Sequence, residues 1–187
     1  MPPKVKITKD EIIQTSIELI RKDGVEAINA RNIASALGCS TQPLFSNFAT
    51  MDELQIAVIE AAHNLYLGFL KREVESGEYP PYKAFGMAYI RFAKEEKELF
   101  KLLFMCDRQE KKLVKTVDFG ASVEMIMKAN GISRERAELM HMEMWICVHG
   151  IGTMLATSFF ELEWKLISDM LSDVYHGLSA RHMSKEG

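Results

Sequence analysis

Residues 38–48 of this 187-residue chain read GCSTQPLFSNF and combine a proline with small hydroxyl and amide side chains. A helix packed into a protein core would carry leucine or alanine at most of these positions. Hydroxyl and amide groups donate and accept hydrogen bonds, and at a surface they do so without the cost of burial. The stretch therefore predicts a short helix that presents polar chemistry outward.

His141, Trp145 and His149 form a second set, in which each residue follows the previous one by four positions. That spacing places all three on one face of a helix. Histidines can bind metal ions, but two histidines eight positions apart lie about 12 Å apart along a helix, too far to hold one ion together. We expect no metal here and interpret the imidazoles either as hydrogen-bonded interior groups or as polar groups lining a ligand site.

The composition favours an all-α protein. Apolar residues make up 48% of the chain, while glycine and proline are few, at 11 and 5 residues, and helix-forming residues fill the periodic segments. The three cysteines are odd in number and far apart, which argues against a disulfide framework and is typical of a reducing compartment. No secretory signal opens the chain, so we expect a cytoplasmic protein.

Residues 144–160 contain no Asp, Glu, Lys or Arg over 17 positions, which reaches the lower limit for a membrane-spanning helix. The stretch also contains His149, two glycines and several hydroxyl side chains. A helix buried in an oligomer interface is the better interpretation, and we expect no membrane association.

The charge is nearly balanced. The net charge is −3, and residues 1–50 carry six Lys or Arg against five Asp or Glu. Binding to a nucleic acid would therefore have to come from the local placement of basic residues rather than from a strongly basic domain.

Capping motifs predict the first helices. Thr8 stands three residues before Glu11, which is the spacing of a capping box, and the helix that follows can end at Gly24. Asn29 can cap a second helix that stops at Gly38.

A third and a fourth helix follow. Ser40 can cap the third, with Pro43 in its first turn, where a missing N–H costs little. Thr50 and Glu53 repeat the capping-box spacing and open a long fourth helix that runs to about residue 76. Further helices are predicted near residues 81–94, 96–106, 110–129, from 133 to about 158, and 162–179.

Ala34, Gly38 and Leu44 have the types and spacing of a helix-turn-helix. The small alanine lets two helices approach closely, the glycine can adopt the positive φ of the turn, and the leucine fills the seam between the helices. An ordinary pair of antiparallel helices can match the same three positions by chance.

Residues 8–59 as a whole resemble the N-terminal domain of the TetR family of bacterial transcription regulators. The shared features are the Gly24 turn, the Ile33-Ala34 and Leu37-Gly38 pairs, the Leu44-Phe45 to Phe48 pattern and the Asp52-Glu53-Leu54 start of the fourth helix. WICVHGIG, residues 145–152, is similar to a Trp-to-His-Gly signature of some TetR-family C-terminal domains, although this second match is shorter.

The resemblance implies an all-α homodimer with two domains. Residues 1–52 would form a three-helix DNA-binding domain, and residues 53–187 a larger helical domain that binds a small molecule and dimerises through its last two long helices. A repressor of this kind leaves a palindromic operator when an apolar ligand binds. No cofactor is implied, and no phosphate loop, metal-ligand spacing or nucleophile motif indicates an enzyme.

The third helix becomes the recognition helix under this interpretation. The amides of Gln42 and Asn47 suit the N6 and N7 atoms of adenine, and Thr41 and Pro43 can contact a thymine methyl. The residues expected to contact DNA are Lys4, Lys6, Arg31, Ser40, Thr41, Gln42, Pro43, Phe45, Ser46 and Asn47.

Two positions depart from the family pattern. Phe45 stands where the family usually has a tyrosine whose hydroxyl reaches a phosphate, and Met51 where it usually has a lysine. Both changes remove phosphate contacts, so we expect weaker binding with a flatter salt dependence unless other basic residues compensate. A protein of this fold that has abandoned DNA and acts as a co-regulator through protein contacts is the alternative.

Large soft side chains are frequent between residues 85 and 160, and such side chains form both cores and adaptable ligand sites. The residues expected to line a ligand site are Phe92, Phe104, Met105, Phe119, Met125, His141, Trp145 and His149. The expected dimer face on the last helix comprises Leu166, Ile167, Met170, Leu171, Val174 and Leu178.

Overall fold

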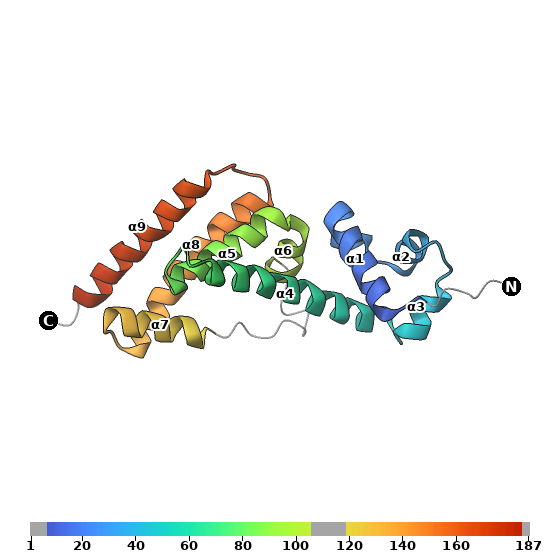
Figure 1. Cartoon of the computed structure of the whole chain (residues 1–187), viewed down its shortest axis with the longest axis horizontal. Coiled ribbons are helices and arrows are strands. Elements are labelled where there is room, and N and C mark those ends of the chain that lie inside the picture. Colours follow the sequence, from blue (N-terminus) through green and yellow to red (C-terminus); the bar gives the residue numbers. More distant parts are fainter. Residues whose placement is uncertain (1–6, 106–118, 185–187) are drawn as a thin grey trace. The chain divides into compact units, whose positions relative to one another are not determined.

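The computed structural model describes residues 7–105 and 119–184, shown as coloured ribbon in Figure 1. The described residues form nine α-helices, one short 3-10 helix and no strand, which confirms the all-α prediction. The helices are α1 (Lys9–Asp23), α2 (Ala30–Ala36), α3 (Gln42–Asn47), α4 (Met51–Ser76), α5 (Pro81–Glu95), α6 (Lys97–Phe104), α7 (Gly120–Asn130), α8 (Arg134–Ala156) and α9 (Trp164–Met183), with the 3-10 helix at Val25–Ala27.

The chain divides by packing into two compact units. The first comprises the residues up to Tyr66 together with α6, and the second comprises Leu67–Glu95 together with α7, α8 and α9. Helix α4 contributes residues to both units. The predicted division after residue 52 follows a sequence motif rather than packing, and it stays a prediction.

The start and end of α1 are as predicted. The Thr8 hydroxyl accepts a hydrogen bond from the Glu11 backbone N–H at 3.2 Å, and the Glu11 carboxylate accepts one from the Thr8 backbone N–H at 2.8 Å. Gly24 ends the helix with φ at 81°. Because α1 buries Ile12, Ile17 and Ile20 completely, it forms much of the core of the first unit.

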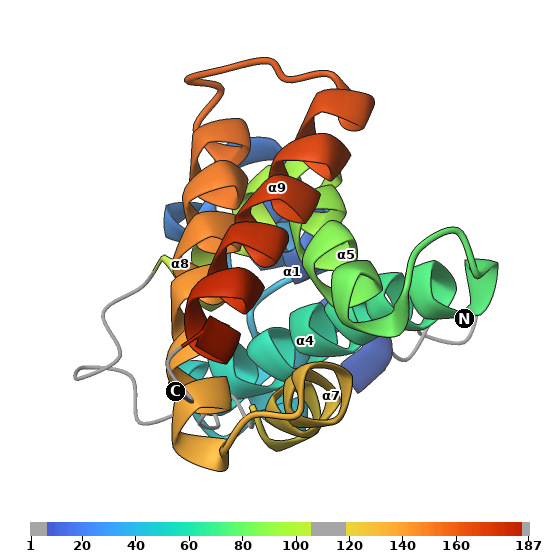
Figure 2. The ribbon, with the colours of Figure 1, turned by 90° about the vertical axis from the view of Figure 1, so that its left-hand side faces the viewer.

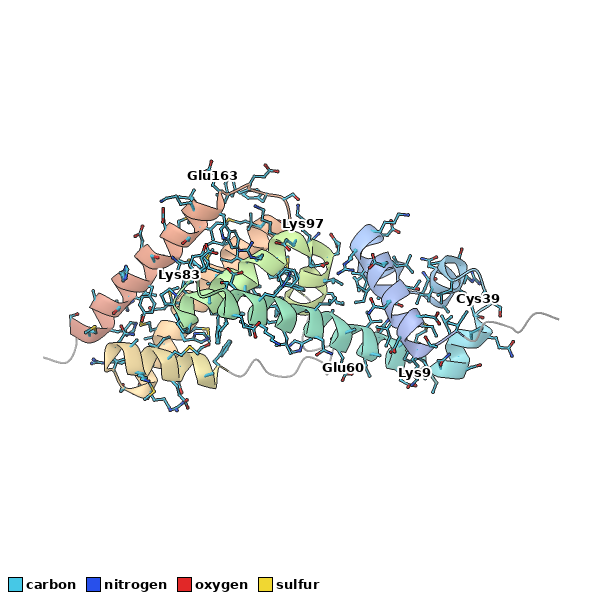
Figure 3. The ribbon with its side chains drawn as sticks, viewed as in Figure 1. Lys9, Cys39, Glu60, Lys83, Lys97 and Glu163 are labelled. Carbon is cyan, nitrogen blue, oxygen red and sulfur yellow. The ribbon has the colours of Figure 1, made fainter. Side chains whose placement is uncertain are left out.

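A Schellman turn joins α2 to the next helix. The side chain of Asn29 caps α2, as predicted, by accepting from the Asn32 N–H at 2.9 Å. At the other end, the Cys39 N–H donates to the Ala34 carbonyl at 2.9 Å, and Gly38 has φ at 64°. Cys39, labelled in Figure 3, lies in this turn.

The prediction that Ser40 caps α3 is wrong. The N-cap is Thr41, whose φ and ψ of −72° and −12° are already helical, and its side chain makes no capping hydrogen bond. The first residue of α3 is Gln42, so Ser40 stands one position too early to be the N-cap. Pro43 lies in the first turn, as predicted.

Helix α4 begins as predicted, with the Thr50 hydroxyl accepting from the Glu53 N–H at 3.1 Å. The Glu53 carboxylate accepts from the Ala49 N–H at 2.7 Å rather than from Thr50, so the capping box is shifted by one residue on that side. Gly77 follows the helix with φ at 67°.

In the second unit, α8 packs against α5, α7 and α9, as Figure 2 shows. A methyl group on Gly86 of α5 would lie 3.2 Å from Val148 of α8 and 3.4 Å from Leu171 of α9, so the glycine permits this close approach. The Ser133 cap of α8 is confirmed by its bond to the Arg136 N–H.

The other predicted helices agree with α5, α6 and α9 to within a few residues. The helix predicted near 110–129 corresponds to α7, and the part of that prediction before Phe119 lies outside the described residues. None of the described helices is long and apolar enough to cross a membrane.

Candidate functional site

Two side chains hold α3 against the rest of the first unit. Leu44 is 1% exposed and Phe48 is 3% exposed, so both belong to the core. The ammonium group of Lys9 lies over the Phe48 ring, 4.9 Å from its centroid. The inner face of α3 is therefore fixed by packing, as the sequence predicted.

The outer face of α3 carries no charge. Gln42, Phe45 and Ser46 are exposed, and half of the Phe45 side-chain surface is open to solvent, at 50%. These positions are spaced by three and four residues, so they share one face of the helix. Thr41 and Pro43 are half-buried beside them.

Some of the polar side chains of α3 already form hydrogen bonds within the protein. The Ser46 hydroxyl donates to the Gln42 carbonyl at 2.9 Å. The Asn47 amide donates to the Pro43 carbonyl at 2.8 Å and to the Ile7 carbonyl at 3.2 Å. Because both N–H groups of Asn47 are engaged, its side chain keeps only an acceptor for other partners.

The basic residues considered for DNA contact differ in their surroundings. Lys9 pairs with Glu53 at 3.4 Å, and both side chains are about half exposed, so this pair contributes little to stability. Arg31 and Ser40 are exposed. Lys4 and Lys6 lie outside the described residues.

A second candidate site is a group of rings in the second unit, which we call the ring cluster: Tyr82, Phe119, His141, Trp145 and His149. The ring centroids of Phe119 and His141 are 4.6 Å apart, and Phe119 also meets Trp145 at 6.0 Å. Trp145 and His149 stack at 5.1 Å, with their planes 12° apart. The predicted shared face of the three α8 residues is confirmed by these contacts.

Two tyrosines of α5, which sequence reasoning missed, bind the two histidines. The Tyr82 hydroxyl and His141 Nδ1 are 2.9 Å apart, and the Tyr89 hydroxyl and His149 Nδ1 are 2.8 Å apart. The tyrosines are two helical turns apart, as the histidines nearly are. That matched spacing was the available signal, but it has meaning only once α5 is known to lie along α8.

His141 has an unusual environment within the ring cluster. It is 9% exposed, and its Nε2 atom is buried with no hydrogen-bond partner among the described residues. Burial lowers the pKa of His141, because the charged imidazolium loses its hydration. The same cause raises the pKa of Tyr82, so that its hydroxyl keeps its proton.

The remaining predicted ligand residues are divided between the two units. Phe92 is fully buried and packs edge-on against Phe69 at 5.3 Å. Met125 is half-buried on α7. Phe104 and Met105 belong to the first unit, where the Phe104 ring meets Tyr66 at 5.3 Å.

Helices α8 and α9 expose large apolar side chains. Of the residues expected at a dimer face on α9, Ile167 and Leu171 are buried inside the second unit, while Leu166 and Met170 are exposed at 48% and 37%. The exposed apolar residues of α8 and the following turn are Leu139, Met142, Ile146, Met154, Phe159 and Phe160.

No protein-family model and no curated protein matches this sequence. Solved structures do match its fold. A TetR-like transcriptional regulator from Rhodococcus sp. RHA1 superposes with a TM-score of 0.70 at 15% identity, covering 94% of this chain and 96% of that one. A fatty acid degradation regulator from Bacillus halodurans gives 0.60 at 13% identity, covering 95% of both chains.

A third structure, a multidrug binding protein complexed with imidazole, gives a TM-score of 0.58 at 13% identity and covers 89% of this chain and 93% of that one. At these identities the comparisons concern the fold. The chain has the fold of the TetR-family regulators, an N-terminal helix-turn-helix followed by a larger helical part.

Proposed function

We propose that this protein is a TetR-type transcriptional regulator that binds a palindromic DNA operator as a homodimer and leaves it when a small molecule binds. The observation that carries the proposal is α3, a short uncharged helix whose inner side chains are buried and whose outer face exposes an amide and an aromatic ring. In a helix-turn-helix, such a face enters the major groove.

The chemistry of the outer face favours A·T base pairs. The Gln42 side chain is exposed, and a glutamine amide binds the N6 and N7 atoms of adenine with two hydrogen bonds. The exposed Phe45 ring, three residues along the same face, suits a thymine methyl group. Guanine is most often read by arginine or lysine, and α3 contains neither.

Phosphate contacts would come from outside α3. Arg31 is the exposed basic residue at the start of α2, and Lys4 and Lys6 belong to the segment before α1. Phe45 lacks a hydroxyl that could hydrogen-bond a phosphate, which lowers affinity without changing charge. Met51 in place of a lysine leaves one phosphate charge unneutralised, so fewer counterions are released on binding. The slope of the salt dependence should then be shallower by about one unit for each phosphate that is no longer neutralised.

Dimerisation would use the exposed apolar side chains of α8 and α9. An exposed apolar patch on a folded protein is costly unless another surface covers it, and a two-fold interface places the same patch on both partners. Two recognition helices related by a two-fold axis then read a palindromic site.

Release would follow from ligand binding to the second unit. Helix α4 contributes to both units, so a change in its tilt would alter the spacing of the two recognition helices. A ligand drives this change only through a higher affinity for one arrangement than for the other. We propose in addition that the protein represses its target genes until the ligand releases it from the operator.

The proposal is tested by selecting binding sites from random DNA, followed by fluorescence anisotropy across a salt series. We expect A·T-rich palindromic sites, whose affinity the Gln42→Ala variant lowers about 5- to 100-fold as it loses the adenine preference. Gln14→Ala, the same change at an exposed residue of α1, is the matched control. Binding that ignores sequence and salt would contradict the proposal.

A double variant, Phe45→Tyr with Met51→Lys, separates a weak DNA binder from a co-regulator that works through protein contacts. Restoring two phosphate contacts should raise the affinity for the selected site and steepen its salt dependence. A protein that binds no DNA before or after the change would favour the co-regulator.

A further inference from the structure

His141 is the buried side chain whose hydrogen bonding is least complete in the ring cluster. Its Nδ1 atom lies 2.9 Å from the Tyr82 hydroxyl, while its Nε2 atom is buried without a partner among the described residues. A buried polar atom of this kind has lost its hydration and gained nothing in return. Binding of a small molecule that forms a hydrogen bond with this atom is therefore favoured.

The Tyr82 contact determines which chemistry the partner must have. If Nδ1 carried the proton, the Tyr82 hydroxyl hydrogen would have no acceptor on His141 and Nε2 would be a bare lone pair, so two groups would be unsatisfied. If the Tyr82 hydroxyl donates to Nδ1, the neutral imidazole carries its proton on Nε2, and a single N–H is unsatisfied. The second arrangement is favoured, and Nε2 is a donor that needs an acceptor.

The groups around His141 indicate the shape and charge of the molecule that could bind there. The Phe119 ring meets His141 edge-on at 4.6 Å and lies 6.0 Å from Trp145, so flat aromatic surfaces adjoin the donor. Tyr82 and Phe119 in turn pack against the buried apolar side chains of α7 and α8. Burial keeps His141 neutral, as its lowered pKa indicates, so the imidazole would offer an anionic acceptor no opposite charge.

We propose that the effector is a flat, mostly apolar molecule that carries a neutral hydrogen-bond acceptor, such as a ring nitrogen or a carbonyl, and that the Nε2–H of His141 binds this acceptor. The assignment rests on the proposed function, because it names the class of molecule that the regulator senses. It also adds one defined polar contact to the expectation of an apolar ligand.

Quinoline and naphthalene test this inference, because they have nearly the same shape and differ by one ring nitrogen. Binding is measured by isothermal titration calorimetry with the full-length protein in the absence of DNA. We expect quinoline or isoquinoline to bind about tenfold more tightly than naphthalene. Equal binding of all three probes, or binding of none, would overturn the inference.

Variants of His141 assign the preference to one atom. His141→Phe should abolish the preference for the ring nitrogen, whereas His141→Gln keeps an N–H donor and should retain part of it. His176→Phe, the same change at an exposed histidine of α9, is the control and should leave the preference intact. A preference that survives in His141→Phe would overturn the inference.

Nitrogen NMR of the histidine side chains keeps the test independent of whether the variants fold. In the wild-type protein, His141 should be the neutral Nε2–H tautomer, and its Nε2 signal should move with quinoline and stay with naphthalene. An Nδ1–H tautomer would contradict the inference. Since no DNA is present, this result is separate from the DNA-binding assay, and either proposal can fail while the other stands.

Discussion

The outer face of α3 and the ring cluster both contain polar groups that have no partner among the described residues, and these groups differ in burial. The Gln42 amide is exposed, so water satisfies it at no cost. The Nε2 atom of His141 is buried, and an unsatisfied buried donor costs about 1–3 kcal/mol. An exposed polar group without a protein partner is available for a hydrogen bond but does not require one. A buried polar group without a partner indicates that a ligand could supply the missing hydrogen bond.

The contrast between the buried and the exposed side of α3 gives the largest expected change in unfolding free energy. Leu44→Ala removes a side chain that is 1% exposed, and the cavity should cost about 2–5 kcal/mol of unfolding free energy. Phe45→Ala, at the next residue and 50% exposed, should change stability by less than about 0.5 kcal/mol while weakening DNA binding.

Urea unfolding followed by circular dichroism measures both variants. Tryptophan fluorescence is the internal control, because Trp145 and Trp164 both belong to the second unit. The Leu44→Ala variant should shift the helix signal more than the fluorescence signal. Equal losses of stability in the two variants would mean that α3 does not have one inner and one outer face.

The contrast between a part-buried and an exposed hydrogen bond gives a smaller effect on stability. Tyr82→Phe leaves both ring nitrogens of His141 without a partner, so it should cost about 1–3 kcal/mol of unfolding free energy. Ser46→Ala removes a hydroxyl that bonds the Gln42 carbonyl in solvent, and the change should be below about 0.5 kcal/mol. Urea midpoints measure both, and an unchanged stability of Tyr82→Phe would mean that water satisfies the His141 imidazole in the folded protein.

The features that the sequence predicted well are local. Thr8 caps α1 and Asn29 caps α2 as expected, because each acts on a backbone N–H three residues away. The inner face of α3 follows from the short spacing of Leu44 and Phe48. Ser40 shows the limit, since one extra residue in the turn moves the cap and no pattern in the sequence specifies it.

The features that the sequence missed join distant residues. Tyr82 and His141 are 59 positions apart, and Asn47 bonds a carbonyl 40 positions away. Helical periodicity places a side chain on a face but does not say which helix lies opposite. Asn47 was therefore expected to be free for adenine, although the carbonyl of Ile7 takes one of its two N–H groups.

The pH dependence of stability gives the smallest effect and tests the burial of His141. Burial holds the pKa of His141 below its ordinary value of about 6.5, so below that pH the unfolded chain binds a proton that the folded protein resists. The unfolding free energy of the second unit should therefore fall as the pH drops from 7.5 to 5.5, by at most about 1.4 kcal/mol per pH unit for this one group.

Urea unfolding followed by tryptophan fluorescence at several pH values measures this slope. His141→Gln should flatten it, while His176→Gln, at an exposed position, should not. Glu143 does not contribute in this window, because its hydrogen bond from His182 lowers its pKa below the ordinary range near 4.5. An unchanged slope in His141→Gln would mean that the imidazole is hydrated in the folded protein, and the ring cluster would then resemble the outer face of α3.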